Sequence, residues 1–498
     1  MLAAGLAPAQ DQPDPGSREQ QEPTYEAPSV LNRQDAFGLY ARAAGATDFA
    51  CAPAALETPA LPAEPDPRDS TYDGPSILSR DNSPSQSAKG AMAAFGLYAQ
   101  IIGVYDSGLT APSVAPGKEL TAVGSVTPTA SFGEETNFGA NVSRRWRRGK
   151  LNIEYRGSYR HYTNAPAFDG LDQFLQLNYR EALFEHVTLD LKNTLGSTTL
   201  ANGAFSYFPL ESLDRIGIPT GELFDSRTNY LQSRIDLTWH LTARLSFDFG
   251  GDGFVVRRAS PLLAGLNGYN ARASVAYRLT ARQTVSASYD NTYFDFQGTY
   301  GNSRLDTIAL GYSIGLTREW DLSTLAGGVR VNTLGLTEVP LDPTVAALTG
   351  QNFAIVTFAN VLYLPVAEAR LIRRFKAGSL TFDYTTGVTP GNGLYLTSRQ
   401  TSGAIAYSYI ATRALQARLN AGYNQLSALG EVVGQALGKY SNLQGGIQVL
   451  YKLTGDAYLD VRYDYRHYTT GDVILENDSS RMTVGVAFSL GETSLGTW

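Results

Sequence analysis

Four histidines and one cysteine are the side chains best suited to catalysis or metal binding in this 498-residue chain. They are His161, His186, His240, His467 and Cys51. Ser158 lies near His161, but a strand would place the two side chains on opposite faces. The scattered histidines and the lone cysteine give no spacing typical of a metal site. We therefore expect no enzyme, no metal site and no cofactor.

One stretch, residues 151–163, alternates apolar and polar side chains with a period of two. Leu151, Ile153, Tyr155, Gly157 and Tyr159 share one parity, and Asn152, Glu154, Arg156, Ser158 and Arg160 share the other. A transmembrane β-strand turns its apolar face to lipid and its polar face to a lumen. The pattern returns at residues 459–466, and both stretches end in YRHYT. The sequence thus predicts transmembrane strands.

The polar parity of these and similar strands predicts charged side chains along the lumen. The lumen-lining residues are predicted to be Glu154, Arg156, Arg160, Asp190, Lys192, Arg234, Asp236, Asp460, Arg462, Asp464 and Arg466, with Arg272, Asp290, Asp306, Arg370, Asp383 and Arg418 on the same face. Opposite charges on neighbouring strands stabilise a sheet, and rings of charge set ion preference in a channel. Two hypotheses stay open: a solute pathway of mixed charge, or a closed pore with salt bridges along its wall.

Composition favours a membrane barrel. Charged residues make up 17% of the chain, below the ~25% of soluble domains. No run of 18 apolar residues occurs, so we expect no transmembrane helix. A membrane protein without such helices satisfies its backbone by closing a barrel. Residues 1–93 hold 13 of the 47 acidic and 6 of the 40 basic residues, so the remainder is neutral and no basic patch predicts nucleic-acid binding.

The short turns share a local motif of an aromatic residue, a basic residue or His, then Leu and Thr. It occurs at residues 239–242, 277–280 and 451–454, with looser versions elsewhere. An aromatic side chain at one depth before each turn predicts a girdle at a membrane interface, which we expect on the periplasmic side. The predicted girdle is Trp146, Tyr179, Trp239, Tyr277, Trp320, Phe375, Tyr409 and Tyr451.

Longer loops alternate with the short turns, and about 18 strands fit between them. The first strand is predicted at residues 95–105. The second is either one long strand at 127–146, which we favour, or a hairpin of 120–130 and 138–146. Residues 196–226 and 334–361 are long enough to fold inward as a constriction, and the latter has room for a hairpin or a helix.

The N-terminal part has its own character, with 12 of the 23 prolines in residues 1–93. We expect residues 1–9 to be the remnant of a signal peptide, 10–93 a disordered, acidic periplasmic leader, and 94–498 the barrel. The segment from Tyr25 to Arg33 matches the segment from Tyr72 to Arg80, and AFGLYA occurs at 36–41 and 94–99. The repeated segments are either docking sites for a periplasmic protein or a partial duplication without function.

From about residue 94 to 490 the chain resembles a bacterial outer-membrane β-barrel of the porin-like kind. The resemblance implies an antiparallel up-and-down barrel of about 18 strands in outer-membrane lipid, with a periplasmic N-terminus. The function that we expect is a channel for passive passage of small hydrophilic solutes. The alternative is a partner-dependent barrel that exports a polysaccharide, which the duplicated leader and sugar-stacking tyrosines favour.

Overall fold

The computed structural model describes residues 92–109, 129–199, 227–260, 263–298, 300–350, 353–393, 396–412, 414–429, 439–454, 456–470 and 476–495. The described residues form 18 strands and two short helical segments. The strands are β1 Met92–Leu109, β2 Thr129–Trp146, β3 Gly149–Tyr162, β4 Gly170–Phe184, β5 Val187–Thr198, β6 Thr228–His240, β7 Leu245–Arg258, β8 Gly265–Thr280, β9 Gln283–Gln297, β10 Gly301–Gly315, β11 Trp320–Pro340, β12 Phe353–Phe375, β13 Gly378–Thr389, β14 Ser398–Ile410, β15 Leu415–Ala428, β16 Lys439–Lys452, β17 Ala457–Thr470 and β18 Glu476–Leu495. The helical segments are the 3-10 turn η2 Pro166–Phe168 and the helix α3 Pro343–Thr349. Within these ranges no helix is long and apolar enough to cross a membrane.

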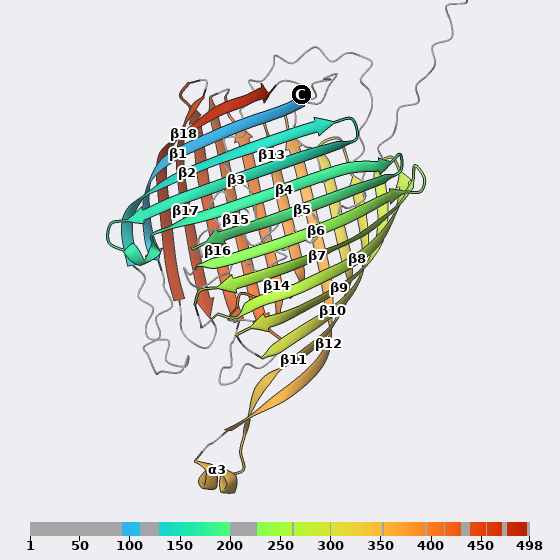
Figure 1. Ribbon diagram of the computed structural model, residues 1–498, viewed down its shortest axis with the longest axis vertical. Helices are drawn as coiled ribbons and strands as arrows, with labels where there is room; N and C mark the ends of the chain where they lie inside the picture. Colours follow the sequence, from blue (N-terminus) through green and yellow to red (C-terminus); the bar gives the residue numbers. More distant parts are fainter. Residues whose placement is uncertain are drawn as a thin grey trace, which may run out of the picture.

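The 18 strands form one closed antiparallel sheet (Figure 1). Each strand pairs with the next in sequence, and β1 also pairs with β18, so the sheet has no free edge around the barrel. The predicted all-β class and the predicted strand number are confirmed. Strand β2 is one long strand, as favoured, and residues 133–136 lie within it instead of forming a hairpin turn.

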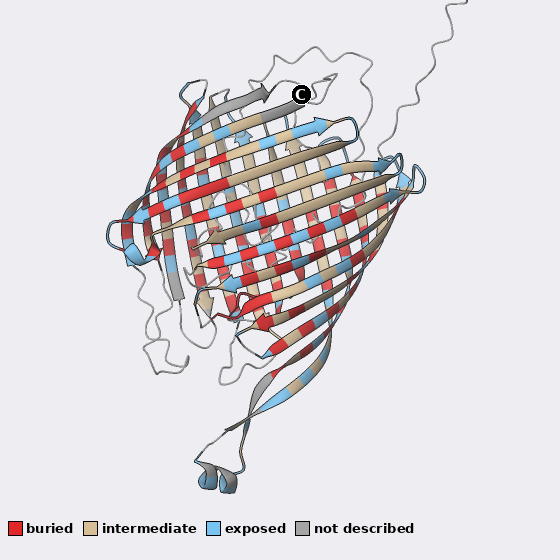
Figure 2. Cartoon of the chain, viewed as in Figure 1, coloured by how far each residue is buried: buried red, intermediate tan, exposed pale blue. Residues whose placement is uncertain are grey.

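Each strand has an apolar outer face and an inner face that carries most of the polar side chains. On the outer face Ile101 is 63% exposed, Ile308 65% and Leu310 67%. On the inner face Arg160, Asp172 and many other polar side chains are buried, and Figure 2 shows burial alternating along the strands. An apolar exterior on a closed antiparallel sheet with an even strand number is the architecture of an outer-membrane β-barrel.

The short turns lie together at one end of the barrel, here called the turn end; the opposite end is the loop end. The threonine of the turn motif explains the motif's recurrence. The Oγ1 atom of Thr242 accepts hydrogen bonds from the backbone N–H groups of Arg244 and Leu245, at 3.2 and 3.0 Å. Thr317 and Thr412 make the same pair of contacts in their own turns. Each threonine thus satisfies backbone donors that a tight turn leaves unpaired.

The β11–β12 hairpin departs from the predicted loops. Residues 334–361 are mostly strand, because β11 and β12 stay paired as far as Pro340 and Phe353, with α3 at the tip. The hairpin projects away from the barrel (Figure 1). The hypothesis that this segment folds inward as a constriction is therefore wrong. The sequence left room there for a hairpin or a helix, and the structure has both. Of the other proposed constriction, residues 196–226, residues 196–198 belong to β5 and residues 200–226 lie outside the described residues. Residues 10–91 of the leader also lie outside the described residues, and residues 92 and 93 belong to β1.

Candidate functional site: the lumen of the barrel

The predicted lumen residues lie on the inner register of their strands. Along β3, Glu154, Arg156 and Arg160 alternate with outward side chains, and the exposed Tyr159 lies on the outer face. The inner register likewise holds Asp190 and Lys192 of β5, Arg234 and Asp236 of β6, and Asp460, Arg462, Asp464 and Arg466 of β17. The parity of the alternation was sufficient to place these charges.

Asp306 is an exception, because the prediction that it faces the lumen is wrong. It shares the parity of Ile308 and Leu310, which face outward on β10. On the outer face its carboxylate accepts hydrogen bonds from the hydroxyl of Tyr289 at 3.0 Å and the amide of Asn291 at 2.6 Å. The apolar alternation of the strand decides the register, and the carboxylate is accommodated by polar neighbours on β9.

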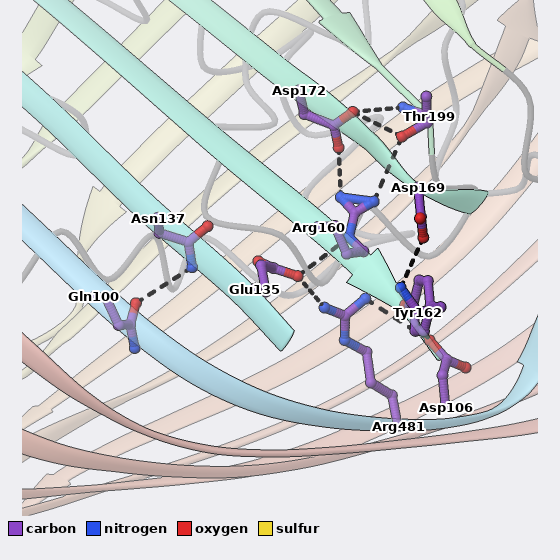
Figure 3. Close-up of polar contacts among 10 residues, drawn as sticks. All are labelled: Gln100, Asp106, Glu135, Asn137, Arg160, Tyr162, Asp169, Asp172, Thr199 and Arg481. Carbon is purple, nitrogen blue, oxygen red and sulfur yellow. Dashed lines mark hydrogen bonds and ion pairs between the residues drawn. The ribbon is translucent and has the colours of Figure 1, made fainter. Parts of the chain in front are cut away.

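A network of buried polar side chains joins five neighbouring strands on one side of the lumen (Figure 3). The carboxylate of Glu135 lies 3.2 Å from Nε of Arg160 and 2.6 Å from Nη2 of Arg481. Nη2 of Arg160 also lies 2.6 Å from a carboxylate oxygen of Asp172. Asp106 lies 3.8 Å from Nη1 of Arg481 and accepts a hydrogen bond from Tyr162. We call these six residues the loop-end network; they come from β18, β1, β2, β3 and β4.

Amides continue this polar wall toward the turn end. The amide of Gln100 donates to Asp460 at 2.9 Å, and Gln448 donates to the other oxygen of the same carboxylate at 3.0 Å. Further along the sheet, Arg370 pairs with Asp383 at 2.7 Å and Arg462 with Asp464 at 2.6 Å. Arg234 and Arg272 both contact Asp236. Most lumen charges are therefore held in pairs, which keeps them fixed against the wall and limits their net field.

The lumen wall is not polar all round. Buried apolar side chains cover the inner face of β7 to β12 near the loop end, among them Val256, Phe294, Leu305, Val329 and Val331. Leu396 from the β13–β14 loop and Leu429 from the end of β15 pack against this cluster. Burial of an apolar inner wall by loop residues requires those loops to lie inside the barrel.

The β13–β14 loop crosses the lumen side of β11 and β12. Its Thr397 hydroxyl lies 2.5 Å from the hydroxyl of Ser303, on the inner register of β10. Gly393 accepts a hydrogen bond from the backbone of Ala264, 2.9 Å away in the β7–β8 loop. The φ of Gly393 is +89°, and a Cβ there would meet the guanidinium of Arg258, so glycine is required. The described parts of these two loops therefore occupy part of the lumen near the loop end, and we call the two loops the constriction. Their lengths gave no sign of this placement.

Burial increases along the lumen from the turn end to the loop end. On β3, Asn152 and Glu154 near the turn are half-buried, whereas Ser158, Arg160 and Tyr162 are buried. On β6, Thr238 is half-buried near the turn, and Gln232 and Tyr230 are buried. The lumen is thus open to solvent at the turn end and tightly packed where the loops fold in.

The predicted girdle residues all lie on the outer register beside short turns. Exposed fractions are 42% for Trp239, 43% for Tyr277 and 47% for Tyr451. Trp146 and Tyr179 contact each other, with ring centroids 5.8 Å apart. The remaining girdle residues, Trp320, Phe375 and Tyr409, have the same placement.

The four histidines lie at the two ends of the barrel. His161 and His467 lie on the outer face at the loop end, 2.7 Å from Asp169 and 2.9 Å from Asp478. His186 lies in the β4–β5 turn, and His240 is the last residue of β6. Across the described ranges, no three His, Cys, Asp or Glu side chains are grouped to hold a metal ion.

Comparison with known proteins finds similarity in solved structures. No family model and no curated protein matches the chain. Pseudomonas aeruginosa OccK9 (OpdG) matches 80% of this chain and 98% of its own length, with 14% identity and a TM-score of 0.40. The outer membrane protein opdK of the same organism matches over 80% and 98%, with 9% identity and a TM-score of 0.40. Acinetobacter baumannii OccAB1 matches over 81% and 99%, with 12% identity and a TM-score of 0.37. Values this low carry no conclusion about the solute or the partners of this chain.

Proposed function

We propose that this protein is an outer-membrane channel for the passive passage of small hydrophilic solutes. The observation that carries the proposal is the contrast between the two faces of the barrel. The outer face is apolar, and the inner face carries charged and amide side chains from the turn end to the loop end. A wall of polar side chains is costly in lipid but is favourable beside a water-filled path.

The passage would run beside the constriction. Its two boundaries are the loop-end network, with Glu135 and Arg160, and the β13–β14 loop held at Thr397. Because the charges along this path are paired, we expect weak preference between cations and anions. The turn end would face the periplasm, as the short turns of such barrels do.

Permeation of neutral sugars tests this function without relying on ion currents. Protein in phosphatidylcholine liposomes should admit small sugars, with a swelling rate that falls steeply as solute size increases. Liposomes that contain the same amount of heat-denatured protein are the control. If liposomes with folded, inserted protein swell no faster than the control liposomes for every solute, the proposal is wrong.

A second candidate function is export of a polysaccharide. Buried tyrosines lie on the inner register near the loop end, including Tyr162, Tyr440 and Tyr468, and the rings of Tyr440 and Tyr468 have centroids 6.3 Å apart. Aromatic faces stack on sugar rings. This function requires a partner, so we expect a periplasmic protein to co-purify and to be lost when residues 72–80 are deleted. An unchanged set of co-purified proteins would count against it.

A further inference from the structure

The β2–β3 turn carries an unusual density of positive charge. Within seven residues it holds Arg144, Arg145, Arg147, Arg148 and Lys150. The four arginines are exposed. In the described part of the chain none of these four arginine side chains has an acidic partner. We call these five residues the basic turn.

Several cations beside other short turns have a partner. Arg374 lies 2.6 Å from the carboxylate of Asp321, and Arg180 lies 2.7 Å from that of Asp190. The guanidinium of Arg373 lies over the ring of Trp320, 4.9 Å from its centroid. The basic turn stands out in its density of charge, because four exposed arginines without an acidic partner in the described part of the chain lie within five residues.

The N-terminal segment leaves the barrel directly beside the basic turn. Strand β1 begins at Met92, whose backbone pairs with Arg145, and Ala93 pairs with Arg144. Arg145 and Lys150 pair across the hairpin on the inner register. Part of the positive charge thus lies at the mouth of the lumen, on the side away from lipid headgroups and beside the residue at which β1 begins.

The segment before β1 carries the opposite charge. Residues 1–91 contain 13 acidic and 6 basic residues. The acidic residues are concentrated in residues 11–26 and 57–73, each with five acidic residues and one basic residue. Each acidic stretch overlaps the start of one copy of the duplicated motif, at Tyr25 or Tyr72.

We propose that the acidic stretches of residues 1–91 dock on the basic turn. Opposite charges within a Debye length attract strongly at low ionic strength, and the covalent link gives an effective concentration of about millimolar. Anionic lipid is the competing occupant, because Trp146 marks the adjacent interface. The inner-register position of Arg145 and Lys150 favours the N-terminal segment.

Cross-linking of the full chain in a neutral detergent tests the docking. The native Cys51 lies between the two acidic stretches and is the only cysteine of the sequence. A second cysteine is introduced by Ala182→Cys, because the backbone N–H of Ala182 donates to the carbonyl of Arg148 at 2.7 Å. The matched control is Ala281→Cys in the β8–β9 turn. Labelling with a monofunctional maleimide corrects for the reactivity of each cysteine.

Docking predicts that a bismaleimide bridges Cys51 to the Ala182→Cys position at least about fivefold faster than to the control position at low ionic strength. The preference should vanish near 1 M salt, where the Debye length is about 3 Å. It should also vanish when the four arginines are replaced by glutamine. Replacing Asp66, Asp69 and Asp73 with asparagine should weaken it without altering the barrel.

Equal rates at the two positions at low ionic strength would overturn the proposal. A preference that persists after both the arginine and the aspartate changes would do the same. If the arginine variant keeps the cross-link but loses binding to phosphatidylglycerol vesicles, lipid is the occupant and the proposal fails. None of these readouts depends on channel activity, so the docking can fail while the proposed function stands.

Discussion

Glu135 supplies the carboxylate that joins the two arginines of the loop-end network. Its carboxylate is 1% exposed and contacts both Arg160 and Arg481. Removing one partner of a buried charge group leaves the others uncompensated, which typically costs about 3–5 kcal/mol. The network therefore stiffens the loop end of the barrel wall.

We predict that Glu135→Gln lowers the free energy of unfolding by about 3 kcal/mol. Urea unfolding of the refolded protein in detergent measures the change. Glu134→Gln is the matched control, because Glu134 is the preceding residue on the exposed outer register. A loss as large for Glu134→Gln as for Glu135→Gln would show that the buried network is not the cause.

The contact between Asp342 and Thr344, at the tip of the projecting hairpin, should be sensitive to acid. Hydrogen bonds from the hydroxyl and backbone N–H of Thr344 lower the pKa of this carboxyl below its ordinary value. The contact should therefore be intact above the ordinary pKa and be lost as the pH falls through the lowered one. Amide exchange at Thr344, which lies in α3, measures it. In Asp342→Asn this acid-induced increase in exchange, corrected for intrinsic rates, should disappear; an identical pH profile would contradict the assignment.

At the scale of elements, the strands and the faces of their side chains can be predicted from the local sequence pattern, but the position of the loops that form the constriction cannot. The alternation around Tyr155 and Arg156 places every side chain of β3 on its observed face, since a period of two has only two registers. The same rule places Asp306 outward, and the inward prediction failed because charge was given more weight than parity. The turn threonines could be found because their hydrogen bonds span two or three residues.

The β13–β14 loop could not be placed from sequence. Its contacts join Thr397 to Ser303 and Gly393 to Ala264, residues far apart in the chain. No periodic pattern encodes such contacts, and length alone pointed to residues 334–361, which extend as a strand pair instead. The position of a short loop that is held by long-range polar contacts is therefore the part of the site that could not be predicted from the sequence.

We predict that Thr397→Val loosens this loop and raises single-channel conductance by about 1.5-fold or more. A single neutral hydrogen bond contributes about 1 kcal/mol, enough to shift a loop between two positions. The matched control is Thr401→Val, which makes the same chemical change on the neighbouring strand, where Thr401 contacts Thr386. Conductance that is equal in the two variants and the parent would show that the loop does not limit passage.

At the scale of the whole molecule, the charges of the barrel balance, and its lumen charges lie mostly in pairs. Residues 1–93 hold all of the net charge of −7, so the remainder is neutral. A neutral, paired wall gives little reason for strong ion selectivity. In a tenfold KCl gradient we predict a reversal potential close to zero, with cation and anion permeabilities within about a factor of two. A reversal potential near the Nernst value of either ion would contradict the paired wall.

Single-channel recording of the full chain in a planar bilayer tests the central claim most directly. A polar path through a closed 18-strand barrel predicts stepwise, steady current that is proportional to voltage. Heat-dependent gel mobility verifies that the protein is folded. Bilayers into which this protein has inserted should show these current steps. The absence of current from verified, inserted protein would contradict the channel and leave a closed barrel whose inner charges serve only to hold its wall.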